Sequence, residues 1–398
     1  MRNITIVGAS LAGYRAAQTL RRDGFDGTVT LVGDEPHRPY DRPPLSKKVL
    51  SGAAEPDSIA LERDGDDLDV DWRLGERAVG FDADSRTVRL GGGDELSSDG
   101  VILACGARPR SLPGTDGLDG MHLLRTLDDS LALREAFESR PSRVVVIGAG
   151  FIGAEVAATA RGMGLDVTLV EALDLPLARV LPPMIGELSA AVHRDHGVDL
   201  RLGVGVDGLE SGDDDRVRAV RLADGSQIEA DVVVVGIGVV PNTGWLEGSG
   251  LTLDNGVVCD ETTLAAPGIV AAGDVARWPN PLFDEVMRIE HWDNAVAMGQ
   301  HAARRLLAGD GPGEPFAPVP YFWTDQYDTK LQLVGRAGPD DAVEVVDGSL
   351  DERRFVAIIG RGDRLVGAVG MNRPPAVMRW QSRIAERMSW DEALALAE

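Results

Sequence analysis

The sequence has very few cysteines, and this scarcity excludes several kinds of site. Only Cys105 and Cys259 occur among 398 residues. Two cysteines cannot build a disulfide framework, a zinc cluster of cysteines or an iron–sulfur site ligated by cysteine alone. The two also stand far apart in unlike contexts, so no redox-active pair is expected.

Long apolar runs and positive charge are scarce as well. The longest apolar runs, such as Val144 to Ile147 and Val232 to Val235, are far shorter than the ~20 residues of a membrane-spanning helix. The net charge of −24 and the isoelectric point of about 4.6 argue against nucleic-acid binding. His193 and His196 lack further ligand-type neighbours, so we expect no metal site.

What is present is typical of a globular protein with a sizeable core. Hydrophobic residues make up 43% and charged residues 26% of the chain. The length predicts two or three domains at roughly 150 residues each. The first residues, Met1 to Ile4, run directly into a strand-like segment, so we expect no signal peptide. We expect a soluble, cytoplasmic protein.

A glycine-rich turn near the start of the chain has the features of a dinucleotide-binding unit. The strand-like run Asn3 to Val7 precedes Gly8-Ala9-Ser10-Leu11-Ala12-Gly13, and a helix-like stretch extends to Arg22. A second strand-like run, Thr28 to Val32, ends at Gly33-Asp34-Glu35. Strand, glycine turn, helix, strand and acid within about thirty residues form the βαβ unit of a dinucleotide site.

The same arrangement occurs a second time. Arg143 to Ile147 precedes Gly148-Ala149-Gly150-Phe151-Ile152-Gly153, and a helix-like stretch runs through Ala160. The next strand-like run, Asp166 to Val170, ends at Glu171. A single glycine turn is also compatible with an α/β domain that binds no ligand. Two copies in the required context favour two nucleotide sites.

Each glycine of such a turn has its own physical role. The first permits a tight turn, the second lets the backbone approach the pyrophosphate, and the third lets helix and strand pack closely. The amides at the helix N-terminus then hold the phosphate charge. In the first copy Ser10 stands at the second glycine position, so the fit is less secure there than at Gly150.

Further strands complete the expected architecture. Val232 to Asn242 is typical of a buried strand that ends in a glycine turn, and Thr262 to Asp274 of a short strand that delivers an aspartate at its carboxyl end. Val101 to Arg110 repeats the strand-then-glycine theme before the second copy. The second dinucleotide unit is therefore expected to be inserted into the first.

The C-terminal part has a different character. Pro320 to Tyr327 opens a strand-rich region, and Phe355 to Ile359 with Leu365 to Val369 predicts a hairpin. A terminal helix is expected from about Ala376 to Met388. The fold class is thus α/β, with two Rossmann-like dinucleotide domains and a small C-terminal α+β domain. The expected boundaries are 1–113 with 241–318 for the first domain, 114–240 for the second and 319–398 for the third.

These motifs together resemble a known family over nearly the whole chain. They are similar to the FAD-containing ferredoxin reductases that serve Rieske dioxygenases and bacterial haem-thiolate monooxygenases. The motifs that carry the resemblance are Gly33-Asp34-Glu35, Tyr40 to Lys47, Leu123 to Thr126, Phe151 to Glu155, Ala272-Gly273-Asp274, Ile289 to Trp292 and Tyr321-Phe322-Trp323. The departures are Ser10 and Cys105, the second where the family more often has Thr.

The resemblance implies that the first unit binds FAD. Asp34 or Glu35 would bind the ribose, and Asp274 the ribityl chain. The helix that begins near Trp292 would point its N-terminus at the pyrimidine edge of the flavin, where negative charge develops on reduction. Plain N-capping of that helix is a compatible alternative. The implied FAD residues are Gly8, Ser10, Leu11, Ala12, Gly13, Asp34, Glu35, Arg42, Lys47, Ala78, Arg125, Gly273, Asp274 and Trp292.

The second unit is expected to bind NADH. Glu171 ends its second strand, where a carboxylate accepts the adenosine 2′-hydroxyl and repels a 2′-phosphate. No Arg follows until Arg179, so NADH is predicted over NADPH. The implied NAD residues are Gly148, Gly150, Phe151, Ile152, Gly153, Glu171, Gly236 and Gly238.

Three residues are candidates for catalytic roles: Lys47, Glu155 and Trp323. In related flavoproteins a lysine of the first unit meets a glutamate of the second unit's helix beside flavin N5, where an ammonium favours the reduced flavin. Read from the residues alone, Lys47 is a solvated loop charge and Glu155 an ordinary first-turn helix acid. For Trp323, core packing and contact with the flavin are both open.

The missing thiols indicate the direction of electron flow. The segment Tyr40 to Leu50 contains no cysteine. A hydride from NADH would therefore go directly to FAD, and electrons would leave one at a time to a 2Fe–2S ferredoxin that feeds an oxygenase. A reductase of a small molecule or quinone, and a redox sensor similar to apoptosis-inducing factor, are the alternatives. A monomer and a homodimer both remain open.

Overall fold

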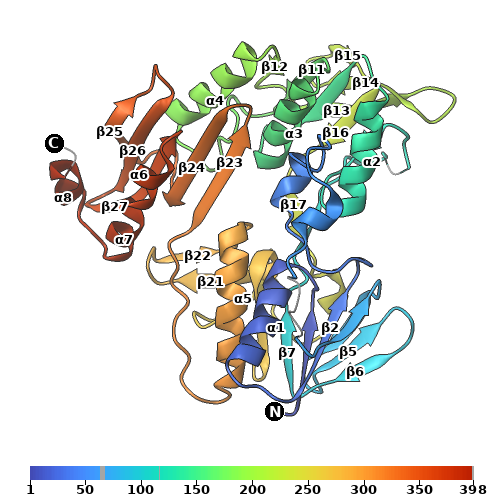
Figure 1. Cartoon of the computed structure of the whole chain (residues 1–398), viewed down its shortest axis with the longest axis vertical. Helices are drawn as coiled ribbons and strands as arrows, with labels where there is room; N and C mark the ends of the chain where they lie inside the picture. Colours follow the sequence, from blue (N-terminus) through green and yellow to red (C-terminus); the bar gives the residue numbers. More distant parts are fainter. Residues whose placement is uncertain (63–67, 116, 397–398) are drawn as a thin grey trace. The chain divides into compact units, whose positions relative to one another are not determined.

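The computed structural model describes residues 1–62, 68–115 and 117–396, which form two compact units (Figure 1). Unit 1 consists of Met1–Asp41, Ile59–Arg108 and Val240–Pro320. Unit 2 consists of Arg42–Ser58, Pro109–Val239 and Tyr321–Glu398. The second glycine turn thus lies in a segment inserted between parts of unit 1, and this confirms the predicted insertion. The predicted three-domain boundaries stay a prediction.

A largely parallel sheet forms the centre of unit 1. Its middle strand β1 (Asn3–Val7) pairs in parallel with β2 (Thr28–Gly33) and β7 (Gly100–Leu103). Ile4, Ile6 and Val7 of β1 are buried, as expected for a strand covered on both faces. The strand order is β19 (Leu264–Ala266), β20 (Ile269–Ala271), β7, β1, β2 and β3 (Asp71–Leu74).

Two helices of unit 1 pack against each other and against this sheet (Figure 1). They are α1 (Leu11–Arg22) and α5 (Trp292–Leu307). A Cβ on Gly299 would lie 2.4 Å from the backbone oxygen of Ala12, so only glycine allows this close approach.

The smaller strands of unit 1 are β4 (Ala78–Asp82), β5 (Thr87–Leu90), β6 (Glu95–Ser97), β18 (Val257–Val258), β21 (Ala276–Asn280) and β22 (Glu285–Met287). The chain leaves unit 1 and enters unit 2 within β8 (Ala107–Pro109), and it returns to unit 1 within β17 (Val239–Pro241).

Unit 2 holds a second parallel sheet. Its middle strand β10 (Val144–Ile147) pairs with β11 (Val167–Val170) and β16 (Val232–Val235), and all four residues of β10 and of β16 are buried. The strand order is β12 (Asp199–Arg201), β11, β10, β16 and β9 (Met121–His122). The helices are α2 (Leu127–Glu138), α3 (Phe151–Gly162) and α4 (Pro183–Asp195), and an antiparallel sheet contains β13 (Val206–Ser211), β14 (Val217–Leu222) and β15 (Gln227–Glu229).

The C-terminal segment of unit 2 is a five-stranded antiparallel sheet followed by short helices. The predicted hairpin is confirmed, because β26 (Arg354–Arg361) pairs antiparallel with β27 (Arg364–Met371). The strand order is β23 (Tyr321–Gln326), β24 (Thr329–Gly335), β27, β26 and β25 (Ala342–Ser349). Within the described ranges, no helix of either unit combines the length and the apolar content that crossing a membrane requires.

The prediction of one terminal helix over Ala376 to Met388 is wrong. The structure has α6 (Pro374–Met378), α7 (Trp380–Ala385) and α8 (Trp390–Ala395). The second helix ends because Arg387 adopts a left-handed backbone with φ of 59° and Met388 N–H bonds back to the carbonyl of Arg383. Ser389 then begins α8 with a capping box.

Candidate functional site

The glycine turn of unit 1 has the geometry of a phosphate-binding loop. Gly8 follows β1 with φ of 123°, and a Cβ there would lie 2.1 Å from the backbone oxygen of Ala104. A Cβ on Gly13 would lie 1.9 Å from the oxygen of Gly8. Ser10 is the N-cap of α1, so the amides of the residues that follow form the first helical turn. Amides of that turn lack partners within the helix and suit a pyrophosphate.

Further predicted FAD residues of unit 1 gather at the start of α1. A Cβ on Gly273 would lie 3.1 Å from Cβ of Ala12 and 3.9 Å from Cβ of Ala295 on α5. Asp274 follows in the same short helical turn, Gly273–Val275. The turn at the end of β20 and the first residues of α1 and α5 therefore lie together, as a site for one extended cofactor requires.

The start of α5 is anchored within unit 1. The structure confirms that this helix begins at Trp292, whose Nε1 donates to Oδ1 of Asp41 at 2.8 Å. Burial raises the pKa of the next residue, Asp293, above its usual range. Asp293 stands in the first turn of α5, where a carboxylate interacts favourably with the helix dipole.

The acids after β2 occupy different surroundings. Asp34 is largely exposed and lies 3.9 Å from Arg77, whereas Glu35 accepts a hydrogen bond from the hydroxyl of Tyr40. Ala78 begins β4, a strand of the small antiparallel sheet that also contains β5 and β6. Three of the predicted FAD residues lie in unit 2: Arg42, Lys47 and Arg125. Arg42 donates to the backbone oxygen of Arg125 at 2.5 Å.

The glycine turn of unit 2 repeats this geometry. Gly148 has φ of 97°, and a Cβ there would lie 2.4 Å from the oxygen of Gly236. A Cβ on Gly153 would lie 1.9 Å from the oxygen of Gly148, whereas a Cβ on Gly150 would meet nothing within 4 Å. The open space beside Gly150 fits a pyrophosphate, and α3 begins with the next residue, Phe151.

Other predicted NAD residues lie around this turn. Glu171, directly after β11, accepts a hydrogen bond from Ala149 N–H at 2.7 Å and one from Leu173 N–H at 3.0 Å. The carboxylate of Glu171 is therefore hydrogen-bonded to the backbone of the glycine turn itself. Gly236 N–H bonds to the oxygen of Ile147 at the end of β10, and Gly238 has φ of 100°.

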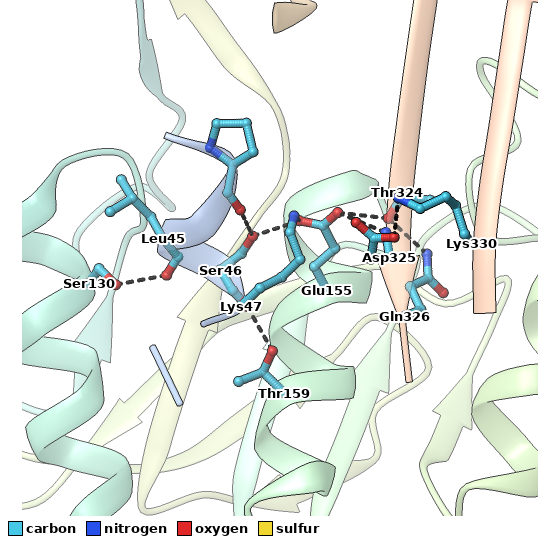
Figure 2. Close-up of polar contacts among 11 residues, drawn as sticks. Leu45, Ser46, Lys47, Ser130, Glu155, Thr159, Thr324, Asp325, Gln326 and Lys330 are labelled. Atoms are coloured by element: carbon cyan, nitrogen blue, oxygen red, sulfur yellow. Dashed lines mark hydrogen bonds and ion pairs between the residues drawn. The ribbon is translucent and has the colours of Figure 1, made fainter. Parts of the chain in front are cut away.

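Lys47 and Glu155 form the most enclosed lysine–carboxylate ion pair described for either unit. Lys47 Nζ lies 2.6 Å from Glu155 Oε2, and the two side chains are 19% and 8% exposed (Figure 2). The expected meeting of these residues is thus confirmed, although they are 108 positions apart in the sequence. Their catalytic role stays a prediction.

Two hydroxyl groups that the sequence did not point to also contact Glu155. Ser46 Oγ donates to Oε2 at 2.6 Å, and Thr324 Oγ1 donates to Oε1 at 2.8 Å (Figure 2). The backbone N–H of Asp325 adds a longer bond to Oε1, of 3.4 Å. Ser46 and Thr324 are flanked by the conspicuous Lys47 and Trp323, and this proximity is the only signal the sequence contains.

Trp323 lies on the half-exposed side of β23. Its ring stacks on that of Tyr321 with a centroid distance of 5.7 Å, and Lys330 Nζ lies 6.0 Å from its centroid. The opposite side of the strand is buried, and there Phe322 packs edge-on against Phe151 of α3 at 4.5 Å. Alternation along the strand therefore places Trp323 outside the core.

Both cysteines lie in unit 1 and are free thiols. Burial raises the pKa of Cys105 to about 11 and that of Cys259 to about 12. Because the thiolate is the reactive form, neither group is prepared for thiol exchange near neutral pH. Electron transfer through sulfur at these positions is therefore disfavoured.

The two units and their sites have counterparts in known proteins. Residues 2–299 match the family model described as pyridine nucleotide-disulphide oxidoreductase, and residues 321–398 match the model described as reductase C-terminal. The chain belongs to the pyridine nucleotide-disulphide oxidoreductase family. This membership confirms the predicted fold class, and it implies the binding of FAD and a nicotinamide nucleotide.

Individual relatives are similar over almost their whole length. Rhodocoxin reductase of Rhodococcus erythropolis is 42% identical over 392 residues, which cover 97% of this chain and 90% of the relative. The ferredoxin–NAD(+) reductase component of the p-cumate 2,3-dioxygenase system of Pseudomonas putida is 37% identical and covers 98% and 94%. The crystal structure of the covalent putidaredoxin reductase–putidaredoxin complex matches with a TM-score of 0.90 at 36% identity, covering 97% of this chain and 93% of that one. The predicted resemblance to ferredoxin reductases is confirmed.

Proposed function

We propose that the chain is an NADH-dependent flavoprotein reductase of a 2Fe–2S ferredoxin that supplies an oxygenase. The observation that carries the proposal is the pair of glycine turns, one in each unit, in a chain whose two thiols both have a raised pKa and are not paired with each other. Relatives named as ferredoxin reductase components of oxygenase systems support the choice of acceptor. When bound, FAD takes up a hydride from NADH and releases its electrons singly.

The residues of the chain would bind and orient the two cofactors. The glycine turn at Gly8 to Gly13 would hold the FAD pyrophosphate, and the turn at Gly148 to Gly153 that of NADH. Glu171 supports the choice of NADH over NADPH, because its carboxylate stands at the end of β11 and would repel a 2′-phosphate.

Lys47 and Glu155 would supply the electrostatics of the reaction. Glu155 lowers the cost of keeping the Lys47 ammonium away from water and holds it in one place. An ammonium beside the flavin ring favours the state that carries more negative charge. Trp323, half exposed on the other side of β23 from Thr324, would contact the flavin or the nicotinamide.

The proposal is tested by spectroscopy and coupled turnover. The purified protein should be yellow, and anaerobic NADH should bleach it. A 2Fe–2S ferredoxin should then carry electrons from it to cytochrome c, with reactions lacking ferredoxin and with quinone as comparison arms. A colourless protein that takes up no FAD would overturn the proposal, and turnover with quinone in place of ferredoxin would reassign the acceptor.

The role of Lys47 is tested by comparing its substitution with the same substitution at the adjacent Lys48. Lys47→Met should slow reduction of FAD by NADH roughly tenfold to a hundredfold, because a preorganised charge next to the reacting ring is lost. Lys48→Met is the matched control, since Lys48 is exposed. Equal rates in the two variants would remove Lys47 from the reaction.

Two further predictions accompany this function. We propose an FAD domain of 1–113 with 241–318, an NAD domain of 114–240 and a C-terminal domain of 319–398. We also propose that the protein acts in the cytoplasm. Its oligomeric state, monomer or homodimer, can be measured by light scattering with and without NADH.

A further inference from the structure

The carboxylate of Glu155 on α3 is surrounded by donors from two other parts of unit 2. Lys47 and Ser46 come from the short helical segment Pro43–Ser46 and the residue after it, and Thr324 comes from β23 (Figure 2). Oε2 is shared by the ammonium and the Ser46 hydroxyl, both at 2.6 Å. Oε1 depends on the Thr324 hydroxyl at 2.8 Å, since the Asp325 amide is 3.4 Å away.

The Thr324 hydroxyl is held in a defined orientation. Gln326 Nε2 donates to Thr324 Oγ1 at 3.3 Å, so the single hydroxyl hydrogen is left for Glu155. Thr324 is 0% exposed and Gln326 is 4% exposed, which leaves little access for a replacement water. The order of donation is therefore Gln326 to Thr324 to Glu155.

The other side of the cluster is fixed through the backbone. Thr159, one turn along α3 from Glu155, donates to the carbonyl of Ser46 at 2.7 Å, and Ser130 of α2 donates to the carbonyl of Leu45 at 2.7 Å (Figure 2). These bonds leave the Lys47 backbone little freedom. The final position of its ammonium then depends on where the Glu155 carboxylate points.

We propose that Thr324 is a positioning residue for hydride transfer: its hydroxyl, oriented by Gln326, fixes the Glu155 carboxylate and thereby the Lys47 ammonium. Without it, Oε1 retains only the long bond from Asp325, and the carboxylate can rotate away from Lys47. The C-terminal segment thus takes part in setting the reaction rate. The inference rests on the proposed function, in which Lys47 lies beside the flavin.

The kinetic test uses the FAD-loaded full chain. Thr324→Val should lower the limiting rate of FAD reduction by NADH roughly tenfold, the size expected when one hydrogen bond to a charged group is lost. The NADH concentration at half-maximal rate should stay within about twofold, because no nucleotide contact changes. Thr324→Ser should restore the rate. Thr329→Val is the matched control on the neighbouring strand, where the hydroxyl donates to Asp328 at 3.4 Å.

A second readout does not depend on activity. The chain has only three lysines, Lys47, Lys48 and Lys330, so ¹⁵N-lysine labelling yields at most three ammonium signals in an NMR spectrum. Lys47→Met assigns the signal of interest. Thr324→Val should shift or broaden the Lys47 signal and leave that of exposed Lys48 unchanged.

The outcomes separate this inference from the proposed function. If wild-type FAD is not reduced by NADH, the proposed function fails. If the wild type reacts normally and Thr324→Val matches it in rate and in the Lys47 signal, only the positioning role is overturned. A slow Thr324→Val variant that Ser does not rescue, with a lowered melting temperature, would indicate a structural role and would also overturn the inference.

Discussion

The two glycine turns of this protein are nearly identical in backbone geometry. Gly8 and Gly148 both have positive φ, and a Cβ on either would lie within 2.4 Å of a backbone oxygen in the neighbouring strand connection. Gly13 and Gly153 both approach the first glycine of their turn so closely that a Cβ would lie 1.9 Å from its oxygen. The two turns therefore share the backbone conformation that exposes the amides at the start of the following helix.

The turns differ in the side chains around this common backbone. The middle position is Ser10 in unit 1 and Gly150 in unit 2. Glu171 bonds to its own turn through Ala149, whereas Glu35 accepts from Tyr40. The comparison leads us to predict that the common backbone binds phosphate in both units, and that the acid after the second strand sets the choice of nucleotide.

The largest effect is expected where the turns are most alike. In Gly13→Ala and Gly153→Ala the new Cβ would overlap a backbone oxygen, at a cost of about 3 kcal/mol or more. The first variant should lose FAD, and the second should stay yellow but fail to bind NADH. Flavin content and NADH titration measure this. Gly162→Ala, where a Cβ meets nothing within 4 Å, is the control, and loss of FAD from Gly153→Ala would break the comparison.

The stability of unit 2 should depend on pH through the buried His193, which lies on α4. Burial, with a smaller contribution from nearby His196, lowers the pKa of His193 on α4 to about 4 from 6.5. The folded state therefore favours the neutral ring, while the unfolded chain takes up a proton below pH 6.5. Stability should fall as the pH drops from 6.5 toward 4, by about 2 kcal/mol at about pH 5.

Urea unfolding at about pH 7 and about pH 5 measures this contribution. His193→Gln should lose less stability than the wild type between the two conditions, since other titrating groups are common to both. His193 Nδ1 lies 3.0 Å from the Tyr327 hydroxyl, so Tyr327→Phe controls for the loss of that contact. An equal loss in the wild type and His193→Gln would refute the assignment.

The preference for NADH over NADPH should depend on Glu171 of unit 2 and not on the acids that follow β2 in unit 1. Glu171→Gln should lower the ratio of kcat/KM for NADH to that for NADPH about tenfold, because the charge that repels a 2′-phosphate is removed. Asp34→Asn, which neutralises one of the two acids after β2 of unit 1, should leave the ratio unaltered. Steady-state kinetics with both nucleotides decide the matter, and a wild type that prefers NADPH would contradict the argument.

The smallest effect is expected at the position where the turns differ. Ser10→Gly makes the first turn resemble the second and should change the free energy of unfolding by only a few tenths of a kcal/mol. FAD content should be unchanged. Thermal unfolding and flavin absorbance test both statements, and a large change in either would show that Ser10 has a specific role.

Much of this fold could be predicted because it depends on local sequence. Each βαβ unit is encoded within about thirty residues by apolar strands, glycines and an acid. The buried strand Val232–Val235 and the hairpin of β26 and β27 follow from short apolar runs as well. The broken terminal helix was missed because the left-handed conformation of Arg387 is one that arginine rarely adopts.

The surroundings of the candidate site were harder to predict. Ser46 and Thr324 are ordinary polar residues, and both gain importance only through Glu155, from which they are separated by 109 and 169 positions. That Arg42–Ser58 belongs to unit 2 was not foreseen either. Contacts of this kind form only when segments that are distant in the sequence pack together, so no local sequence pattern predicts them.

By itself the sequence determined two glycine turns of the dinucleotide-binding type, the insertion of one unit in the other and the lack of a paired thiol, since all three follow from residue types and their positions along the chain. Only the tertiary structure decided which groups surround Glu155, on which side of β23 Trp323 lies and where the terminal helices end. The physical reason is that a buried carboxylate must find donors wherever the folded chain supplies them, and the chain here supplies them from two distant segments.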